Sequence, residues 1–129
     1  MNIYEIIPNL FITNTKYTGN TIKYILYLDC HYDNDNDNNN THSLFLYSYN
    51  NYIGFLINGA VTFIEKYINN KILIISDLLA VPIAIGFLCK NFNIPIIDAF
   101  NLIKKVKADT YYDNLYIDQI EVWVNKKIQ

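Results

Sequence analysis

Runs of apolar residues separated by short polar breaks predict five strands in this 129-residue chain. The run Ile72–Ile75 contains no polar residue, which is typical of a central strand covered on both faces. The run Tyr24–Leu28 has the same character. Near the start of the chain, Pro8 and Asn9 interrupt an apolar segment and predict a turn between two short strands. We expect strands at two places within 3–12, and at 24–28, 44–47 and 72–75.

Apolar residues spaced three and four apart predict four helices in the rest of the chain. They are expected at 58–68, 82–90, 96–107 and 113–127, and a short helix or turn is expected at 18–22. Pro82 lies in the first turn of the second helix, where the missing N–H costs little. Residues expected to face the core are Ile97, Phe100, Ile103 and Val106 in the third helix, and Leu115, Ile117, Ile120 and Val124 in the fourth, with Trp123 partly buried.

The composition is that of one globular domain spanning residues 1–129, because 52% of the residues are hydrophobic and only 17% are charged. A net charge of −2 and a pI near 5.5 leave no basic surface for nucleic acid. Two cysteines make no disulfide framework, and Cys89 is expected in the core. Residues 72–89 are apolar enough for a membrane span, but Asp77 and Pro82 near their centre favour a buried strand and helix. We therefore expect a cytoplasmic protein with no membrane partner.

A polar tract at 33–41 begins with alternating Asp and Asn residues, ends in Asn39, Asn40 and Thr41, and is expected to be a mobile loop. The spacing of Asp33, Asp35 and Asp37 is similar to the start of an EF-hand calcium loop. Asn38 stands where the turn glycine belongs, and Leu44 stands where the bidentate glutamate belongs. The sequence therefore predicts no calcium site, and we expect no cofactor.

The strand, tight turn and helix within 72–91 have the arrangement at which α/β proteins bind anions, because free backbone N–H groups and the helix dipole meet there. Here the turn carries aliphatic side chains and an acid, and the chain contains no arginine. The arrangement is therefore that of an anion site without the groups that would hold an anion.

The order and spacing of several segments resemble the dual-specificity, cysteine-based protein phosphatase family over nearly the whole chain. The opening IYEIIPNLFITN at 3–14 is similar to the family's first strand pair, and IKYILYL at 22–28 is similar to a later strand. Phe63-Ile-Glu matches the end of the helix before the catalytic strand, and 94–107 and 114–123 resemble the last two helices. The resemblance implies a three-layer α/β fold, in which helices flank a roughly five-stranded, mostly parallel central sheet on both faces.

The family's signature loop, His-Cys-x-x-Gly-x-x-Arg-Ser/Thr, would fall on the nine residues from Ile75 to Ile83. Ser76 stands at the nucleophilic cysteine and is a poor substitute, since a hydroxyl is not ionised as a thiol is. Pro82 replaces the arginine that clamps the phosphoryl group and also removes a backbone donor. Leu79 replaces the glycine, and Asp77 adds a negative charge.

The general acid of the family should lie near 47–51, where Asn50 or Asn51 would occupy its place without an ionisable proton. Nucleophile, phosphate clamp and acid are all missing, so the resemblance implies a catalytically inactive member, with no catalytic residue at the degenerate loop. We expect the loop to have a structural role instead. Leu78, Leu79, Ala80 and Val81 fill the former pocket, and Ser76 or Asp77 caps the next helix.

Two other interpretations use the same residues. A serine hydrolase would pair Ser76 with His31 or His42, but Ser76 lacks the glycines of a nucleophile elbow. A phosphopeptide-binding module would use the remnant anion loop, although the arginine is gone.

We therefore expect a pseudophosphatase that acts by protein–protein interaction, as a competitor, a scaffold or a host-interaction factor. The high apolar fraction and the tyrosines suggest hydrophobic surface for a partner protein or a homodimer. Active phosphatases of this type occur in large A/T-rich DNA viruses such as poxviruses, and the absence of arginine resembles the product of such a genome. By that analogy the chain is a viral homologue that acts in the host cytoplasm.

Overall fold

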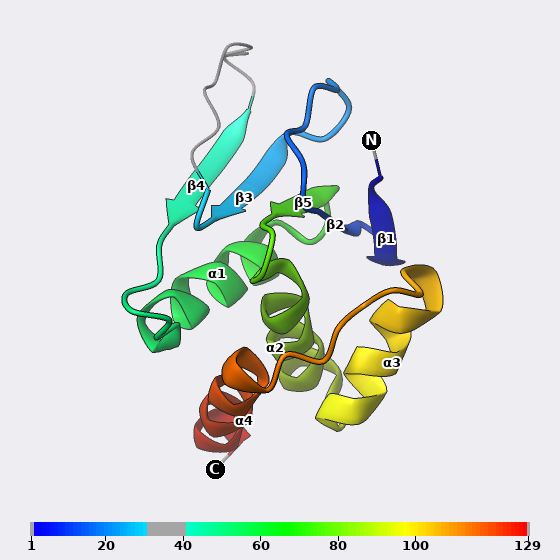
Figure 1. The fold of residues 1–129 in the computed structure, drawn as a ribbon. Helices are drawn as coiled ribbons and strands as arrows, with labels where there is room; N and C mark the ends of the chain where they lie inside the picture. The colour runs from blue at the N-terminus through cyan, green and yellow to red at the C-terminus, as the bar shows by residue number, and fades with distance from the viewer. Residues whose placement is uncertain (1, 31–40, 129) are drawn as a thin grey trace.

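The computed structural model describes residues 2–30 and 41–128, which form a sheet covered on one side by helices (Figure 1). The strands are β1 (Tyr4–Ile7), β2 (Leu10–Thr13), β3 (Tyr24–Leu28), β4 (His42–Leu46) and β5 (Ile72–Ile75). The helices are α1 (Gly54–Tyr67), α2 (Ala80–Phe92), α3 (Ile96–Val106) and α4 (Asn114–Ile128). The predicted mobile loop spans 33–41, and its residues 33–40, with the calcium-like spacing, lie outside the described residues, as does His31.

The sheet has the order β1-β2-β5-β3-β4, so the most apolar strand lies at its centre. β5 pairs in parallel with β2 on one side and with β3 on the other, and Ile72 is in register with both Leu10 and Tyr24. β4 adds in parallel to β3, and β1 alone runs antiparallel. The turn between β1 and β2 places Asn9 at φ 77°, a left-handed conformation that asparagine tolerates. The α/β class and the five-stranded, mostly parallel sheet inferred from the sequence are therefore confirmed.

Alternate residues of β5 point into two different cores. Ile72 and Ile74 belong to the large core shared with all four helices, whereas Leu73 and Ile75 belong to a smaller core on the opposite face. All four are buried, as predicted for a central strand.

The second face of the sheet is covered by the irregular segment 14–22, which forms bends where a short helix or turn was expected. Tyr17 organises this segment, because its hydroxyl oxygen accepts hydrogen bonds from the N–H groups of Thr21 (3.1 Å) and Ile22 (3.0 Å). Within the described residues the helices therefore lie on one face only, so the expectation of helices on both faces was wrong. The layer on the other face comes from Tyr17, Ile22 and their neighbours.

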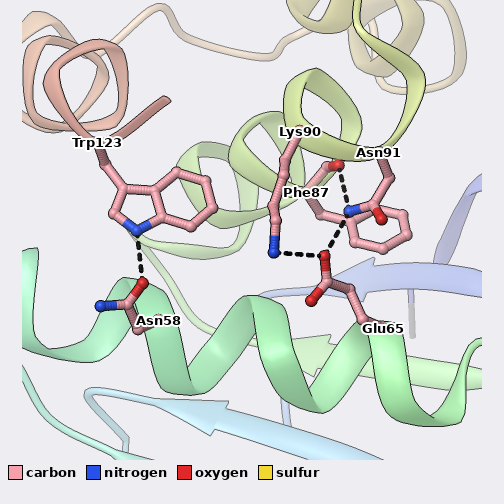
Figure 2. A network of polar contacts seen from close by, with 6 residues as sticks. All are labelled: Asn58, Glu65, Phe87, Lys90, Asn91 and Trp123. Carbon is pink, nitrogen blue, oxygen red and sulfur yellow. Dashed lines mark hydrogen bonds and ion pairs between the residues drawn. The ribbon is translucent and has the colours of Figure 1, made fainter. Parts of the chain in front are cut away.

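Polar contacts join the helices to one another (Figure 2). The Glu65 carboxylate on α1 pairs with Lys90 of α2 at 2.9 Å and accepts a hydrogen bond from the amide of Asn91 at 3.0 Å. The Trp123 indole N–H on α4 donates to the side-chain oxygen of Asn58 on α1 at 2.8 Å. These contacts fix α1 against both α2 and α4.

The predicted core positions of α3 and α4 were partly wrong. Ile97, Val106 and Leu115 are 54%, 42% and 51% exposed. α3 packs chiefly against β1 and α2, and its buried stripe is narrow and centres on Phe100 and Ile103. On α4, Ile117, Ile120 and Val124 are buried as predicted. Tyr116 is buried in place of Leu115, and Trp123 is buried as well.

Two findings bear on ligands and membranes. Among residues 2–30 and 41–128, no helix combines the length and the apolar character that crossing a bilayer requires. Across the same part of the chain, no group of three or more metal-ligating side chains comes together.

Candidate functional site

The candidate site lies where β2, β5 and β3 end, which is the edge of a parallel sheet where α/β proteins bind ligands. Ser76 follows β5 directly and is 3% exposed. Its N–H donates to the carbonyl of Thr13 at the end of β2 at 3.1 Å. On the other side, the thiol of Cys30 after β3 lies 3.5 Å from the carbonyl of Ile75. The loop from Ser76 onward is thus held at the sheet edge by both neighbouring strand ends.

The Ser76 side chain caps the turn that leads into α2. Its hydroxyl oxygen accepts a hydrogen bond from the backbone N–H of Leu79 at 3.0 Å, and this contact is buried. Asp77, the other candidate cap, is exposed. The N-cap of α2 is Leu79 and has no side-chain cap, so the expectation that Ser76 or Asp77 caps this helix was wrong. The Ser76 hydroxyl instead closes the turn before the helix, accepting the N–H three residues ahead.

Three loop positions have no N–H left for an anion. The N–H of Ser76 is bonded to Thr13, the N–H of Leu79 is bonded to the Ser76 hydroxyl, and Pro82 has none. The first helical bond of α2 follows at once, from the N–H of Ile83 to the carbonyl of Leu79 at 3.0 Å.

The aliphatic residues of the loop divide between core and surface. Leu79 and Ala80 are buried in the large core and Val81 packs partly against it, whereas Leu78 is 57% exposed. The expectation that all four fill a pocket is therefore wrong for Leu78. Leu79 has a φ of −103°, in a region open to any residue, so the loop accepts leucine at the glycine position without backbone strain.

Asn50 and Asn51, expected at the place of the general acid, form a tight two-residue turn. Their φ angles are 49° and 63°, and the flanking residues Tyr49 and Tyr52 exchange backbone hydrogen bonds of 3.2 and 2.8 Å. Two successive left-handed residues define a type I′ turn, which asparagine favours. These asparagines therefore have a structural reason to be there.

Side chains of α4 fix this turn, and no local sequence pattern predicts their role. The Gln119 side-chain oxygen accepts the N–H of Ile53 at 2.8 Å, and its amide donates to the carbonyl of Asn51 at 2.9 Å. The Tyr116 hydroxyl donates to the side-chain oxygen of Asn51 at 3.3 Å. Burial, followed by the charge of nearby Asp113, raises the pKa of Tyr116, so this hydroxyl stays protonated as a donor.

An acid that sequence reasoning overlooked, Asp29, stands at the carboxyl end of β3 with a φ of 53°. One carboxylate oxygen accepts the N–H of Ser48 at 2.7 Å and the other accepts its hydroxyl. Both oxygens therefore anchor the chain after β4. The signal for this residue was an acid placed directly after a buried strand, which is a common position for functional carboxylates in α/β folds.

The serine hydrolase arrangement is not formed with His42. His42 begins β4 in register with Tyr24 and stacks on that ring with a centroid distance of 4.8 Å. Ser76 lies beyond Ile75, whose partner on β3 is Tyr27, three residues further along the same strand. At a rise of about 3.3 Å per residue, the two side chains lie toward opposite ends of the sheet.

Comparisons with known proteins identify the fold. No protein-family model and no curated protein sequence matches the chain. Human tyrosine phosphatase-like serine/threonine/tyrosine-interacting protein superposes with a TM-score of 0.84 at 15% identity, covering 98% of each chain. Human DUSP28 gives 0.82 at 9% identity, covering 97% of this chain and 96% of that one.

A leucine-rich repeat and phosphatase domain protein of Entamoeba histolytica gives a TM-score of 0.79 at 21% identity, covering 96% of this chain and 91% of that one. At such identities the likeness is one of fold. The chain therefore has the α/β fold of the dual-specificity and tyrosine-phosphatase-like proteins, as the resemblance implied.

Proposed function

We propose that this protein is a catalytically inactive member of the phosphatase fold that acts by binding another protein. The observation that carries the proposal is the use of the Ser76 hydroxyl as a hydrogen-bond acceptor for the Leu79 N–H. A residue at the nucleophile position is thereby committed to holding the loop. Its backbone N–H is committed in the same way, to Thr13.

The phosphate clamp and the acid support the same proposal. The chain contains no arginine, so no guanidinium can grip a phosphoryl group with two parallel hydrogen bonds. The buried Pro82 at that position offers neither a charge nor an N–H. Asn50 and Asn51 have no proton to give to a leaving group at neutral pH, and their left-handed turn accounts for their identity.

The interaction role rests on what the fold does elsewhere and on this surface. One protein of this fold is named a phosphatase-like interacting protein, which supports a binding role for a chain without the reaction. The exposed aromatic side chains Tyr49, Tyr52 and Phe55 are of the type that interfaces favour. The role is that of a competitor, scaffold or host-interaction factor in the cytoplasm, which is the host's if the chain is viral.

The test is turnover of a generic aryl phosphate by the purified chain, compared with Ser76→Ala and with an active dual-specificity phosphatase. We expect hydrolysis at the buffer rate for both forms of this chain. Turnover above that rate that disappears in Ser76→Ala would overturn the proposal.

The phosphopeptide-binding alternative is tested separately by titration with a phosphotyrosine peptide, for which we expect no saturable binding. Saturation that is lost when Asp77 and Ser76 are changed would favour the alternative. A stoichiometric protein partner in a pull-down, retained by the same variants, would place the interface away from the loop.

A further inference from the structure

A pocket of about 460 Å³ opens between the start of α1 and the outer side of α4. Buried Ile57 and Trp123 contribute its apolar wall, and the Trp123 bond to Asn58 fixes the two helices that form it (Figure 2). The exposed side chain of Val122 belongs to its lining. The pocket lies away from the Ser76 loop, and nothing proposed above uses it.

Exposed aromatic rings lie beside this pocket. Tyr52 lines it and makes an edge-on contact with Phe55, with ring centroids 5.1 Å apart. Phe55 is 81% exposed, and Tyr49 across the turn is 72% exposed. The Asn50–Asn51 turn, which Gln119 ties to α4, holds the chain that carries these rings. We call Tyr49, Tyr52, Phe55, Val122 and the pocket the aromatic face.

The sequence around this face is depleted in charge. From Thr41 to Ile64 it contains no Asp, Glu, Lys or Arg, although 17% of the whole chain is charged. Depletion of charge together with enrichment of aromatic residues is the composition of interface cores, and it differs from that of ordinary surface. The neutral surface creates no charge repulsion when it meets a copy of itself.

The charges that do line the pocket have a self-complementary arrangement. Asp118, Val122 and Lys126 are spaced four residues apart on α4, and all three line the pocket. This spacing places them on one face of the helix, with the two charges about 12 Å apart. Within the described part of the chain, neither Asp118 nor Lys126 takes part in an ion pair.

We propose that a second copy of this chain docks on the aromatic face about a two-fold axis that passes beside Val122. The axis makes the two α4 helices antiparallel, so that Asp118 of each copy faces Lys126 of the other. Helices pack with axes 8–10 Å apart, a distance at which such side chains meet. The same axis brings the aromatic faces of the two copies together.

The dimer deepens the proposed function by naming a partner. The biological role of the dimer rests on the proposed function, whereas the surface that forms it does not. The reciprocal ion pairs supply orientation, since a parallel arrangement would place like charges together. The aromatic rings and the pocket supply apolar area, which is where most binding free energy resides.

The experiment is sedimentation velocity over a concentration series, on the full chain and on charge-reversal variants. The wild type is expected to form a species of twice the 15.1 kDa monomer mass. Asp118→Lys and Lys126→Asp should each remove the dimer by placing like charges opposite one another. The double variant should restore it. Both residues are exposed, so the fold should survive, as circular dichroism will verify.

Matched controls distinguish association through the aromatic face from nonspecific association. Glu121→Lys changes an exposed acid elsewhere on α4, and Tyr111→Ser removes a 76%-exposed aromatic outside the face; both should leave the dimer intact. Phe55→Ser should raise the dissociation constant of the dimer at least tenfold. A wild type that stays monomeric, or a double variant that does not recover the dimer, overturns the inference.

The outcomes for the two proposals are distinct. A monomer without phosphatase activity refutes the dimer and leaves the proposed function standing. A dimer that hydrolyses aryl phosphate does the reverse.

Discussion

Replacing Ser76 by alanine isolates the structural role that the structure gives to this side chain. The substitution removes the oxygen that accepts the buried N–H of Leu79 and changes nothing else of comparable size. Because Leu79 is fully buried, its N–H would be left without a partner or would need water to enter the core. The loop would then lose the contact that sets the start of α2.

The expected cost follows from the loss of an acceptor for a buried donor. Leaving a buried donor unsatisfied costs about 1–3 kcal/mol. We therefore expect Ser76→Ala to lower the free energy of unfolding by about 1–2 kcal/mol. For a domain of this size, that corresponds to a melting temperature lower by about 3–8 °C.

The assay is urea unfolding followed by Trp123 fluorescence, with Asp77→Asn as the matched control. Asp77 is adjacent but exposed, so its substitution should stay within about 0.5 kcal/mol at physiological salt. Equal stability of Ser76→Ala and wild type would refute this structural role of the hydroxyl, as would a larger loss in Asp77→Asn than in Ser76→Ala. Either result would mean that the hydroxyl does not hold the loop.

Three further predictions concern the Asn50–Asn51 turn, the buried thiol of Cys89 and phosphatase activity. Gln119→Ala should cost about 1–3 kcal/mol in urea unfolding, because it leaves the N–H of buried Ile53 without its acceptor; Glu121→Ala, which is exposed, should cost far less. Burial raises the pKa of Cys89 from 9.0 to about 11, so the unfolded chain loses this proton first and stability should fall as pH rises from about 9 to 11. In Cys89→Ala that part of the decline should be absent, and identical pH slopes for the two proteins would contradict the burial effect. Restoring the family residues with Ser76→Cys and Pro82→Arg should not revive aryl phosphate turnover, since the acid and the glycine are also missing; robust turnover would mean that the loop still has its catalytic shape.

The strands were the most predictable part of the fold. β3 and β5 begin and end at the predicted residues, because uninterrupted apolar runs leave little choice of boundary. α1 begins at Gly54, four residues earlier than predicted. Its start depends on the Gln119 bond to Ile53, a contact between residues 66 apart that no local pattern reveals. Propensity is local, whereas this helix start is set from α4.

Side-chain burial was less predictable, because it depends on which neighbours an element acquires. Ile97 and Val106 have helical spacing with Phe100, yet α3 packs chiefly against β1 and α2 and leaves them at the surface. Ser76 closes the turn before α2 and caps no helix, because α2 starts only after Leu79, a boundary that no local pattern reveals. The Asn50–Asn51 pair is a sequence signal for the left-handed turn that the structure contains.

The central claim is that the loop after β5 no longer holds a phosphate-like oxyanion. A crystal soaked in tungstate tests it most directly, because the heavy anion is visible even at partial occupancy. We expect no tungstate over Ser76, with the Leu79 N–H still bonded to the serine hydroxyl. Tungstate seated above Ser76 and held by the loop amides would contradict it.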